Sequence, residues 1–329
     1  MTQPLVLVTG ARGYVGGRLV AHLRGEGKYR VRTGSRVVLP SAQGEAAAIG
    51  ELADDAQLEK ACEGAACVVH LASLNEIDSE REPERAIDVN VTGTLRLARA
   101  AKRVGVRRFV YMSTAHVYGA PLAGRIDETT VTRPVHPYAI THRAAEDFVF
   151  GACIGSQVEA VVLRLSNAVG APADPAVQRW SLLVNDLCRQ VVTTGRIVLR
   201  SAGLAQRDFI AMSDACRAVS HFLELPTERL PAGPLNLGGG RSWRVIDVVE
   251  LVADRCAALL AFRPVIDRPV HSPGESAPKL DYRIDRLLAT GFELRGDLSQ
   301  EIDATLQLCV EAFSGGAGSG VPRTVGGRT

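Results

Sequence analysis

Short apolar runs alternate with amphipathic segments along most of the chain. The apolar runs are rich in Val, Leu and Ala and end in turns, which is typical of strands buried on both faces. Strands are predicted at 5–9, 29–33, 66–72, 107–112, 158–165, 197–199 and 235–237. Helices are predicted after Gly16 and at 54–62, 84–104, 137–150, 177–194, 213–225 and 245–260. This order predicts an α/β fold with a Rossmann-like, doubly wound parallel sheet and right-handed crossovers.

Three glycines interrupt the chain directly after the first predicted strand. Gly10 permits a tight turn, Gly13 lets backbone N–H groups approach a pyrophosphate, and Gly16 lets the next helix pack closely on the strand. The alternative is a glycine turn that holds no ligand, which the position after a buried strand disfavours. The pattern therefore indicates a dinucleotide site.

The end of the second predicted strand bears on which dinucleotide binds. An acidic residue at this place accepts hydrogen bonds from the ribose hydroxyls of NAD, whereas a small residue followed by Arg can hold the 2′-phosphate of NADP. This chain has Ser35 followed by Arg36. NADP(H) is therefore favoured, with NAD(H) as the alternative. If this strand end holds no ligand, Arg36 is simply an exposed arginine in a loop.

The regular alternation of strands and helices ends at about residue 166. Residues 1–166, joined by 205–236, are predicted to form the dinucleotide-binding domain, and 167–204 with 237–313 a smaller C-terminal lobe. Residues 74–84 are polar and are expected to form a loop, and 263–313 are expected to contain long loops. The Gly- and Ser-rich residues 314–329 are predicted to be a disordered tail.

Composition narrows the class of partner. The 329 residues include 38 Lys and Arg against 36 Asp and Glu, a net charge of +2, which argues against nucleic acid or an anionic membrane as the main partner. No secretion leader and no apolar run of about 18 residues is seen, so a cytoplasmic protein is expected. The seven cysteines are scattered without metal-ligand spacing, which favours reduced thiols and no metal.

Five motifs occur together in one order along the chain. They are Thr9-Gly10-x-x-Gly13-x-x-Gly16, Ser113-Thr114 before Val117-Tyr118-Gly119, Tyr138 at the start of a helix, Arg164-x-x-Asn167-x-x-Gly170, and Arg207-Asp208-Phe209. Together they resemble the extended short-chain dehydrogenase/reductases, in the group of nucleotide-sugar epimerases, dehydratases and reductases such as UDP-glucose 4-epimerase. The resemblance covers about residues 4–313.

The resemblance implies an NAD(P)-dependent enzyme with a substrate lobe for a nucleotide sugar. It also implies a homodimer formed through the helices at 84–104 and 137–153. In the family, a tyrosine exchanges a proton with a sugar oxygen while the nicotinamide exchanges hydride at the same carbon. Tyr138 matches that tyrosine, and Thr114 matches the Ser or Thr that binds the same oxygen. The alternative for Tyr138 is a surface tyrosine at a helix start.

The fourth position after the tyrosine departs from the family, which has Lys where this chain has His142. The family lysine binds the nicotinamide ribose, and its charge lowers the pKa of the tyrosine. Histidine can do the first, but it can do the second only when protonated. Arg143 points about 100° away on an ideal helix and is a poor substitute. Turnover is therefore expected to be slower than with the family lysine, or to become faster as the pH is lowered.

The resemblance also carries over binding residues. The implied cofactor contacts are Gly10, Arg12, Gly13, Tyr14, Val15, Gly16, Ser35, Arg36, Glu51, Leu52, Leu71, Ala72, Ser73, Asn90, Tyr138, His142 and Leu165. The implied substrate contacts are Asn75, Thr114, Asn167 and Arg207. For Arg207 and Asp208 the alternative is a surface ion pair.

Two further departures narrow the chemistry. The 4,6-dehydratases of the family carry Asp-Glu directly after the Thr, whereas this chain has Ala115 and His116, which disfavours dehydration. The family often has Arg two residues before Gly-Asp to clamp the diphosphate, whereas Ser272 precedes Gly274-Glu275 here. Arg207 remains as the candidate ligand of a diphosphate.

Three functions stay open at this point. The first is an NADPH-dependent 4-keto-sugar reductase, which Ser35 and Arg36 favour because the cellular NADP pool is mainly reduced. The second is an NAD-dependent nucleotide-sugar 4-epimerase. The third is a dinucleotide-binding sensor of little turnover, supported mainly by His142.

Overall fold

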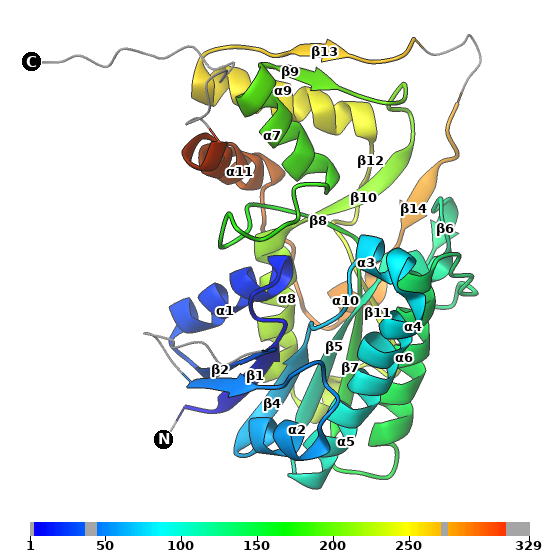
Figure 1. The fold of residues 1–329 in the computed structure, drawn as a ribbon. Helices are drawn as coiled ribbons and strands as arrows, with labels where there is room; N and C mark the ends of the chain where they lie inside the picture. The colour runs from blue at the N-terminus through cyan, green and yellow to red at the C-terminus, as the bar shows by residue number, and fades with distance from the viewer. Residues whose placement is uncertain (1–2, 37–44, 271–275, 314–329) are drawn as a thin grey trace, which may run out of the picture.

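A computed structural model describes residues 3–36, 45–270 and 276–313 of the chain. The predicted tail 314–329 and the segment with Ser272, Gly274 and Glu275 lie outside the described residues. The lower part in Figure 1 is a sheet between helices, and the upper part is a smaller group of helices and short strands. Within the described ranges, no helix is long and apolar enough to cross a membrane.

Seven parallel strands form the large sheet in the order β11-β7-β5-β4-β1-β2-β3. They are β1 Leu5–Thr9, β2 Arg30–Ser35, β3 Glu45–Ala48, β4 Ala65–His70, β5 Arg108–Thr114, β7 Glu159–Leu165 and β11 Leu235–Leu237. The chain builds outward from β1 on one side and then from β4 on the other, so the order reverses between these two strands. The predicted doubly wound α/β fold is confirmed, and ligands of such sheets bind at this reversal.

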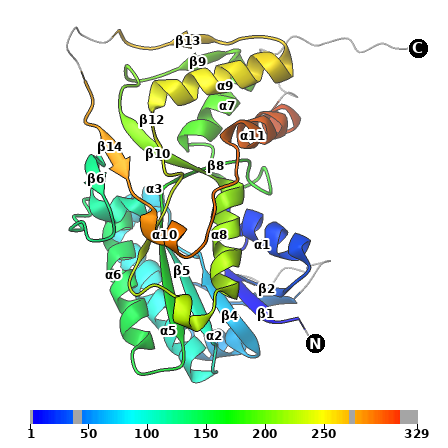
Figure 2. The same ribbon diagram turned by 180° about the vertical axis from the view of Figure 1, so that it is seen from behind.

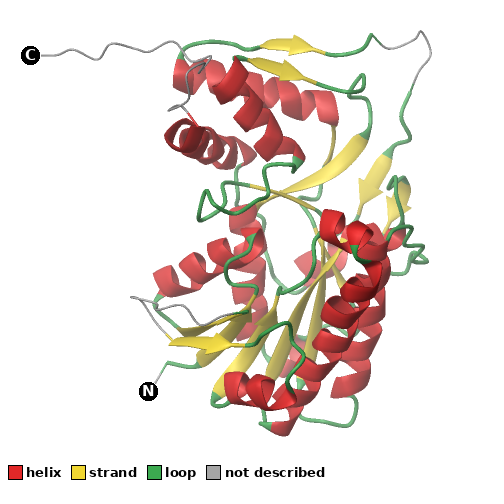
Figure 3. Cartoon of the chain, viewed as in Figure 1, coloured by secondary structure: helices red, strands yellow, loops and turns green. Residues whose placement is uncertain are grey.

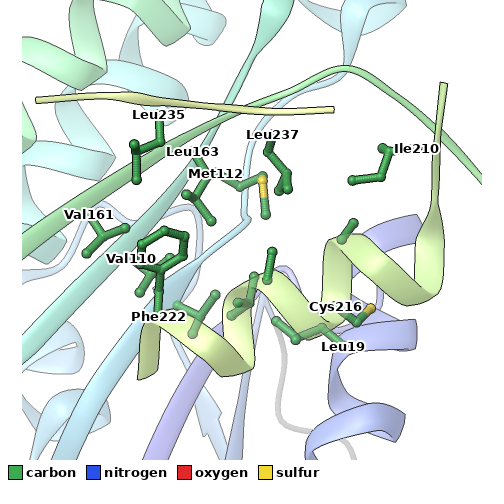
Figure 4. Packing of buried hydrophobic residues seen from close by; sticks show 14 of the residues in the cluster. Leu19, Val110, Met112, Val161, Leu163, Ile210, Cys216, Phe222, Leu235 and Leu237 are labelled. Carbon is green, nitrogen blue, oxygen red and sulfur yellow. The ribbon is translucent and has the colours of Figure 1, made fainter. Parts of the chain in front are cut away.

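The two faces of the sheet bury separate cores because successive side chains of a strand point to opposite faces. On β1, Val6 and Val8 join one core, and Leu5 and Leu7 join the other. Helices α1 (Tyr14–Glu26) and α8 (Met212–Glu224) cover the first face. Figure 4 shows Phe222 of α8 against Val110 of the sheet, and Cys216 of α8 beside Leu19 of α1.

The other face is covered by helices that follow β3, β4 and β5 in the chain. They are α2 (Asp55–Cys62), a continuous run of α4 (Pro83–Ala86), a π-helical segment (Ile87–Gly93) and α5 (Thr94–Arg103), and α6 (Pro137–Cys153). The predicted helix at 84–104 is therefore present, with a π-helical stretch inside it. Helix α5 packs between α2 and α6. The view from behind in Figure 2 shows α8 on the opposite side from α6.

The upper part contains a third core, between helices α7 (Leu183–Thr194), α9 (Val245–Leu260) and α11 (Leu298–Phe313). Its short strands pair as β12-β10-β8 (Ser242–Arg244, Gln206–Ala211, Asn167–Val169), as β13-β9 (Val265–Asp267, Arg196–Val198) and as β14-β6 (Leu280–Tyr282, Gly124–Ile126). Figure 3 shows these pairs as yellow arrows above the large sheet.

The structure corrects four local predictions. The segment 74–84 contains a helix, α3 (Glu76–Arg81), because the Asn75 side chain caps it by accepting a hydrogen bond from Asp78 N at 2.9 Å. The helix predicted at 177–194 begins only at Leu183. The stretch 263–313 holds α10 (Asp285–Ala289) and the 16-residue α11 in addition to loops. The strand predicted at 66–72 ends at His70, where Thr9 binds the His70 ring.

Candidate active site

A cavity of about 590 Å³ opens where β1, β4, β5 and β7 end. Its walls come from the large sheet below and from the loops before α7 and around β8 and β10 above. Sixteen of the residues predicted to bind cofactor or substrate line it, namely Gly10, Arg12, Gly13, Tyr14, Val15, Gly16, Arg36, Leu71, Ser73, Asn75, Thr114, Tyr138, His142, Leu165, Asn167 and Arg207. The fold thus brings together residues that lie up to about 200 positions apart in the chain.

Five predicted cofactor residues do not line this cavity, namely Ser35, Glu51, Leu52, Ala72 and Asn90. Glu51 pairs with Arg85, and Leu52 is buried against Gly93 of the π-helical segment. Asn90 accepts a hydrogen bond from Leu74 N at 2.7 Å and donates one to Thr141 Oγ1 at 3.0 Å. These contacts hold the walls in place.

The glycine turn forms the floor at one end of the cavity. Gly10 has a φ of 67°, and a Cβ at Gly16 would lie 2.1 Å from Gly10 O, so no larger residue fits this turn. Helix α1 begins directly after Gly13, and no described side chain caps its first turn. Its free N–H groups and the helix dipole favour a bound phosphate. The turn, the cavity and this helix end fit a dinucleotide.

Tyr14 lies on the first turn of α1 and joins the two parts of the molecule. Its side chain is buried, and its hydroxyl donates a hydrogen bond to Gly170 O at 2.7 Å. Burial raises the pKa of Tyr14 well above its usual value, so the phenol stays protonated. Tyr14 therefore ties the glycine turn to the strand β8 on the far side of the cavity.

Tyr138 and Thr114 meet in the centre of the cavity. Tyr138 lies on the first turn of α6, and Thr114 is the last residue of β5. Both side chains line the cavity, where the Thr114 hydroxyl neighbours the phenol closely enough to affect its pKa. Burial raises the pKa of Tyr138, and the carboxylate of Glu76 raises it further, whereas Arg179 and Thr114 lower it. The net pKa lies above the usual value, so Tyr138 is a protonated phenol at neutral pH.

His142 lies one helical turn after Tyr138, with the two ring centres 4.1 Å apart. Its Nδ1 is 2.9 Å from Tyr138 O. Because a carbonyl oxygen only accepts hydrogen bonds, Nδ1 carries the proton, and Nε2 of the neutral ring is an acceptor. Burial lowers the pKa of His142 to about 4. His142 therefore carries no charge at neutral pH and does not supply the positive charge of a lysine.

Three charged or ionisable residues in this cavity were not predicted to be functional. Glu76 at the start of α3 and Arg179 in the loop before α7 form an ion pair of 3.0 Å, and His116 lines the wall beside them. Burial raises the pKa of Glu76, but Arg179, a backbone hydrogen bond and His116 together outweigh this effect, so the net pKa is lowered. No local motif marks Glu76 or Arg179, because only the fold brings their two segments together.

Arg207 and Asn167 line the upper wall on adjacent strands, β10 and β8. The Arg207 side chain makes no ion pair or hydrogen bond with another described residue, and the Asp208 carboxylate instead accepts hydrogen bonds from Ser166 Oγ at 2.5 Å and Gly239 N at 2.8 Å. An Arg207–Asp208 ion pair is therefore not formed. Asn167 Nδ2 donates to Asp208 O at 2.8 Å. The Arg207 guanidinium is thus available to an anion.

Arg164, which belongs to one of the five motifs, is part of a buried network below the cavity. It forms a two-point ion pair with Glu146 of α6, with bonds of 2.9 and 2.6 Å, and donates to Tyr118 OH at 2.8 Å. Glu146 also accepts a hydrogen bond from Ser113, the neighbour of Thr114. This network fixes α6 to β5, and so fixes Tyr138 relative to Thr114.

Comparison with known proteins places these features in a family. The model of the NAD dependent epimerase/dehydratase family matches residues 6–238. A UDP-glucose 4-epimerase of Streptomyces lividans is 31% identical over 272 residues, which cover 75% of this chain and 79% of that protein. A dTDP-glucose 4,6-dehydratase of Streptomyces antibioticus is 28% identical over 309 residues, 87% and 90% of the two chains.

A solved structure is similar to this chain over most of its length. The structure of MoeE5 in complex with UDP-glucose and NAD superposes with a TM-score of 0.74 at 26% identity. The match covers 92% of this chain and 97% of MoeE5. The similarity therefore includes both the large sheet and the upper part of the molecule.

Proposed function

Because the chain belongs to the NAD-dependent epimerase/dehydratase family, we propose that it exchanges hydride between NADP(H) and C4 of a nucleotide-diphosphate sugar. We propose the direction of a 4-keto-sugar reductase. The observation that carries this proposal is the Tyr138–Thr114 pair, with Tyr138 held protonated in the cavity. A protonated phenol is the form that reduction of a ketone requires, because the alkoxide formed must receive a proton.

The proposed mechanism assigns one task to each residue. When bound, the nicotinamide supplies the hydride for the carbonyl carbon. Tyr138 donates its proton to the sugar oxygen O4, and the Thr114 hydroxyl stabilises the charge that develops on that oxygen. His142 Nε2 accepts a hydrogen bond from a ribose hydroxyl of the cofactor, where a lysine would donate one. His142 thus positions the cofactor without adding charge.

The preference for NADP(H) rests on Arg36. Its exposed side chain lines the cavity directly after β2, where it can pair with a 2′-phosphate. Arg36→Gln is expected to reduce the ratio of NADPH to NADH affinity about tenfold, while Arg99→Gln on the exposed side of α5 leaves the ratio unchanged. Fluorescence titration of both cofactors measures this ratio. An equal ratio in Arg36→Gln and the unmodified protein contradicts this role.

The nucleotide sugar is proposed to lie across the upper wall. Arg207, which has no described ion-pair partner, would pair with the diphosphate, and Asn167 would bind beside it. Asn75 lines the sugar end, although its side chain also caps α3. The division into a domain of residues 1–166 with 205–236 and a lobe of 167–204 with 237–313 stays part of this proposal, because it puts the cavity between cofactor and substrate parts.

A 4-epimerase is the second candidate, favoured by the relatives. The Streptomyces lividans relative is a UDP-glucose 4-epimerase, and an epimerase uses the same tyrosine and threonine. Such an enzyme begins by oxidising the sugar, so its tyrosine must first accept a proton. The raised pKa of Tyr138 and the neutral His142 oppose that step.

The experiment that tests the proposal measures NADPH oxidation with a panel of UDP- and dTDP-4-keto sugars between pH 5.5 and 8. Turnover is expected, and Tyr138→Phe is expected to lower kcat by about 10² to 10⁴. Tyr29→Phe removes a hydroxyl that binds Glu224 away from the cavity, and it serves as the matched control with unchanged turnover.

Two other outcomes would decide against the reductase. Interconversion of C4 epimers without net cofactor oxidation, together with tightly bound NAD released on denaturation, would support the epimerase. Cofactor binding without turnover of any sugar would support the third candidate, a dinucleotide-binding sensor.

A further inference from the structure

An ion pair joins the two parts of the molecule at the mouth of the cavity. Glu76 begins α3 in the large-sheet part, and Arg179 lies in the upper part, in the loop 171–182 before α7, which we call the strap. The charged atoms of the two side chains are 3.0 Å apart, and both residues line the cavity. The side chains are also 36% and 21% exposed, so the pair lies between the cavity and solvent.

The strap holds the backbone of Arg179 firmly in the upper part. The neighbouring Trp180 is buried, and its ring meets Phe313 of α11 edge-on with the ring centres 5.0 Å apart. The carbonyl oxygen of Arg179 accepts a hydrogen bond from Asn185 Nδ2 of α7 at 3.2 Å. The guanidinium therefore reaches α3 from a fixed base, and the two parts meet here through side chains.

The contacts on the other side of the cavity are of a different kind. Figure 1 shows α1 and α3 on opposite sides of the site. On the α1 side, Arg18 binds the buried Glu301 at 3.0 Å and Ala171 O at 2.9 Å. On the α3 side, the bond from Arg179 to Glu76 is the one ion pair or hydrogen bond between strap and α3 among the described residues. An exposed ion pair contributes little stability, so the α3 side is the side that can open.

We propose that the Glu76–Arg179 ion pair is a latch that closes the cavity over a bound nucleotide sugar and opens when this ligand enters or leaves. The proposal rests on the proposed function for the class of ligand. With the latch closed, the strap and α3 keep water away from the keto sugar beside Tyr138. With the latch open, water solvates both charges, since each side chain is already partly exposed. Opening then limits the rate at which the nucleotide sugar exchanges.

Stopped-flow binding of UDP-glucose and dTDP-glucose to the full-length protein with NADP⁺ tests the latch. Glu76→Gln and Arg179→Gln are each expected to raise the association and dissociation rate constants together, by about tenfold, because binding no longer waits for opening. The dissociation constant is expected to stay within about threefold. If Arg179 were instead a direct ligand of the diphosphate, Arg179→Gln would raise the dissociation rate constant alone, which would overturn the proposal.

Two further variants separate the latch from a general effect on folding or charge. The doubly substituted Glu76→Arg, Arg179→Glu protein rebuilds the pair with the charges exchanged, and both rate constants are expected to return to within about threefold of the unmodified protein. Glu250→Gln breaks the exposed pair that α9 forms with Arg263 and is the matched control with unchanged rates. Unchanged rates in Arg179→Gln, or a charge-exchanged protein as fast as the single variants, would contradict the latch.

The latch and the reductase fail in different ways. The binding rates are measured without NADPH or a keto sugar, so they do not depend on turnover. A protein that oxidises no NADPH with any 4-keto sugar but shows the expected binding rates would overturn the reductase and support the latch. NADPH oxidation together with unchanged binding rates in Arg179→Gln would overturn the latch alone.

Discussion

The side chain at position 142 shows how a single residue changes the electrostatics of the site. A lysine there would place a positive charge one turn from Tyr138 and lower the pKa of the phenol. The neutral His142 leaves burial and the Glu76 carboxylate to raise that pKa. A site with this balance keeps Tyr138 in its protonated form at neutral pH, which can donate a proton to a sugar oxygen but cannot accept one.

The pH dependence of turnover tests this balance. Because the pKa of His142 is about 4, its protonation falls below the range of pH 5.5 to 8, and no rise in kcat toward acid is expected from it there. The increase of kcat with acidity that the sequence leaves open would therefore occur only below pH 5.5. In His142→Lys, the added charge lowers the pKa of Tyr138, so kcat is expected to increase about tenfold.

The alkaline limb of the same profile should also move to lower pH in His142→Lys, because tyrosinate then forms earlier. His22→Lys on α1, beside Glu26, adds the same charge away from the cavity and should leave the profile unchanged. Full pH profiles of kcat measure both effects. A profile of His142→Lys that overlays the unmodified one would remove His142 from the electrostatics of Tyr138.

Residues of the site were predictable where they lie in local motifs. Gly10, Thr114 and Tyr138 are each marked by a fixed spacing to a strand or helix end, and the structure brings them to one cavity. Glu76 and Arg179 have no such spacing, because their pair joins α3 to a loop 100 residues later. The hydrogen bond from His142 to Tyr138 O, which fixes the tautomer of the ring, could not be predicted from the sequence either, because it depends on the rotamer of the side chain.

At the scale of elements, the glycine turn is the most constrained junction. A Cβ at position 16 would meet Gly10 O, which is backbone and cannot move aside. Gly16→Ala is therefore expected to lower the free energy of unfolding by about 1–3 kcal/mol and to weaken cofactor binding. Urea unfolding and cofactor titration measure the two effects.

Gly25 in the same helix provides the matched control. A Cβ there has no described neighbour within 4 Å, and alanine favours a helix over glycine by about 0.5–1 kcal/mol. Gly25→Ala should thus stabilise the protein slightly and leave cofactor affinity unchanged. Equal effects of the two substitutions would show that close packing at the turn is not the cause.

Helices and strands were predicted best where burial produces a clear pattern of apolar residues in the sequence. Six of the seven strands of the large sheet are predicted, most of them from buried apolar runs, although β2 is only partly buried. The strand that was not predicted, β3, Glu45–Ala48, is a short Ala-rich strand at the edge. Helix α11 was missed although Ile302, Leu306 and Cys309 recur on its buried face. That spacing was a usable signal. Helix α3 is short and depends on its cap, so its pattern is weak.

At the scale of the whole molecule, ion pairs join the upper part to the large sheet. Arg18 of α1 binds Glu301 of α11 at 3.0 Å and Ala171 O at 2.9 Å, and Glu301 also accepts a hydrogen bond from Ser213 N. Together with Tyr14 and Gly170, these contacts connect the glycine turn to the far wall of the cavity. Such long-range contacts could not be predicted from the sequence.

The homodimer implied by the family resemblance remains a prediction. Ile87, Ile140 and Phe148 lie on the helices expected to pair and are 53%, 49% and 43% exposed. Light scattering is expected to give the mass of a dimer, and Phe148→Glu should shift it toward the monomer, because a charge in an apolar interface is costly. Val265→Glu on β13 is the control. A monomeric unmodified protein would contradict this assembly.

The central claim is that Tyr138 and a nicotinamide cofactor act together at C4 of a nucleotide sugar. The most direct test supplies NADPH carrying deuterium at the nicotinamide C4, in both diastereomeric forms, with dTDP- and UDP-4-keto-6-deoxyglucose. The account predicts deuterium at C4 of the product sugar from one of the two forms, and product formation that is about 10²- to 10⁴-fold slower with Tyr138→Phe. Bound cofactor with no deuterium at C4 of any sugar would contradict it.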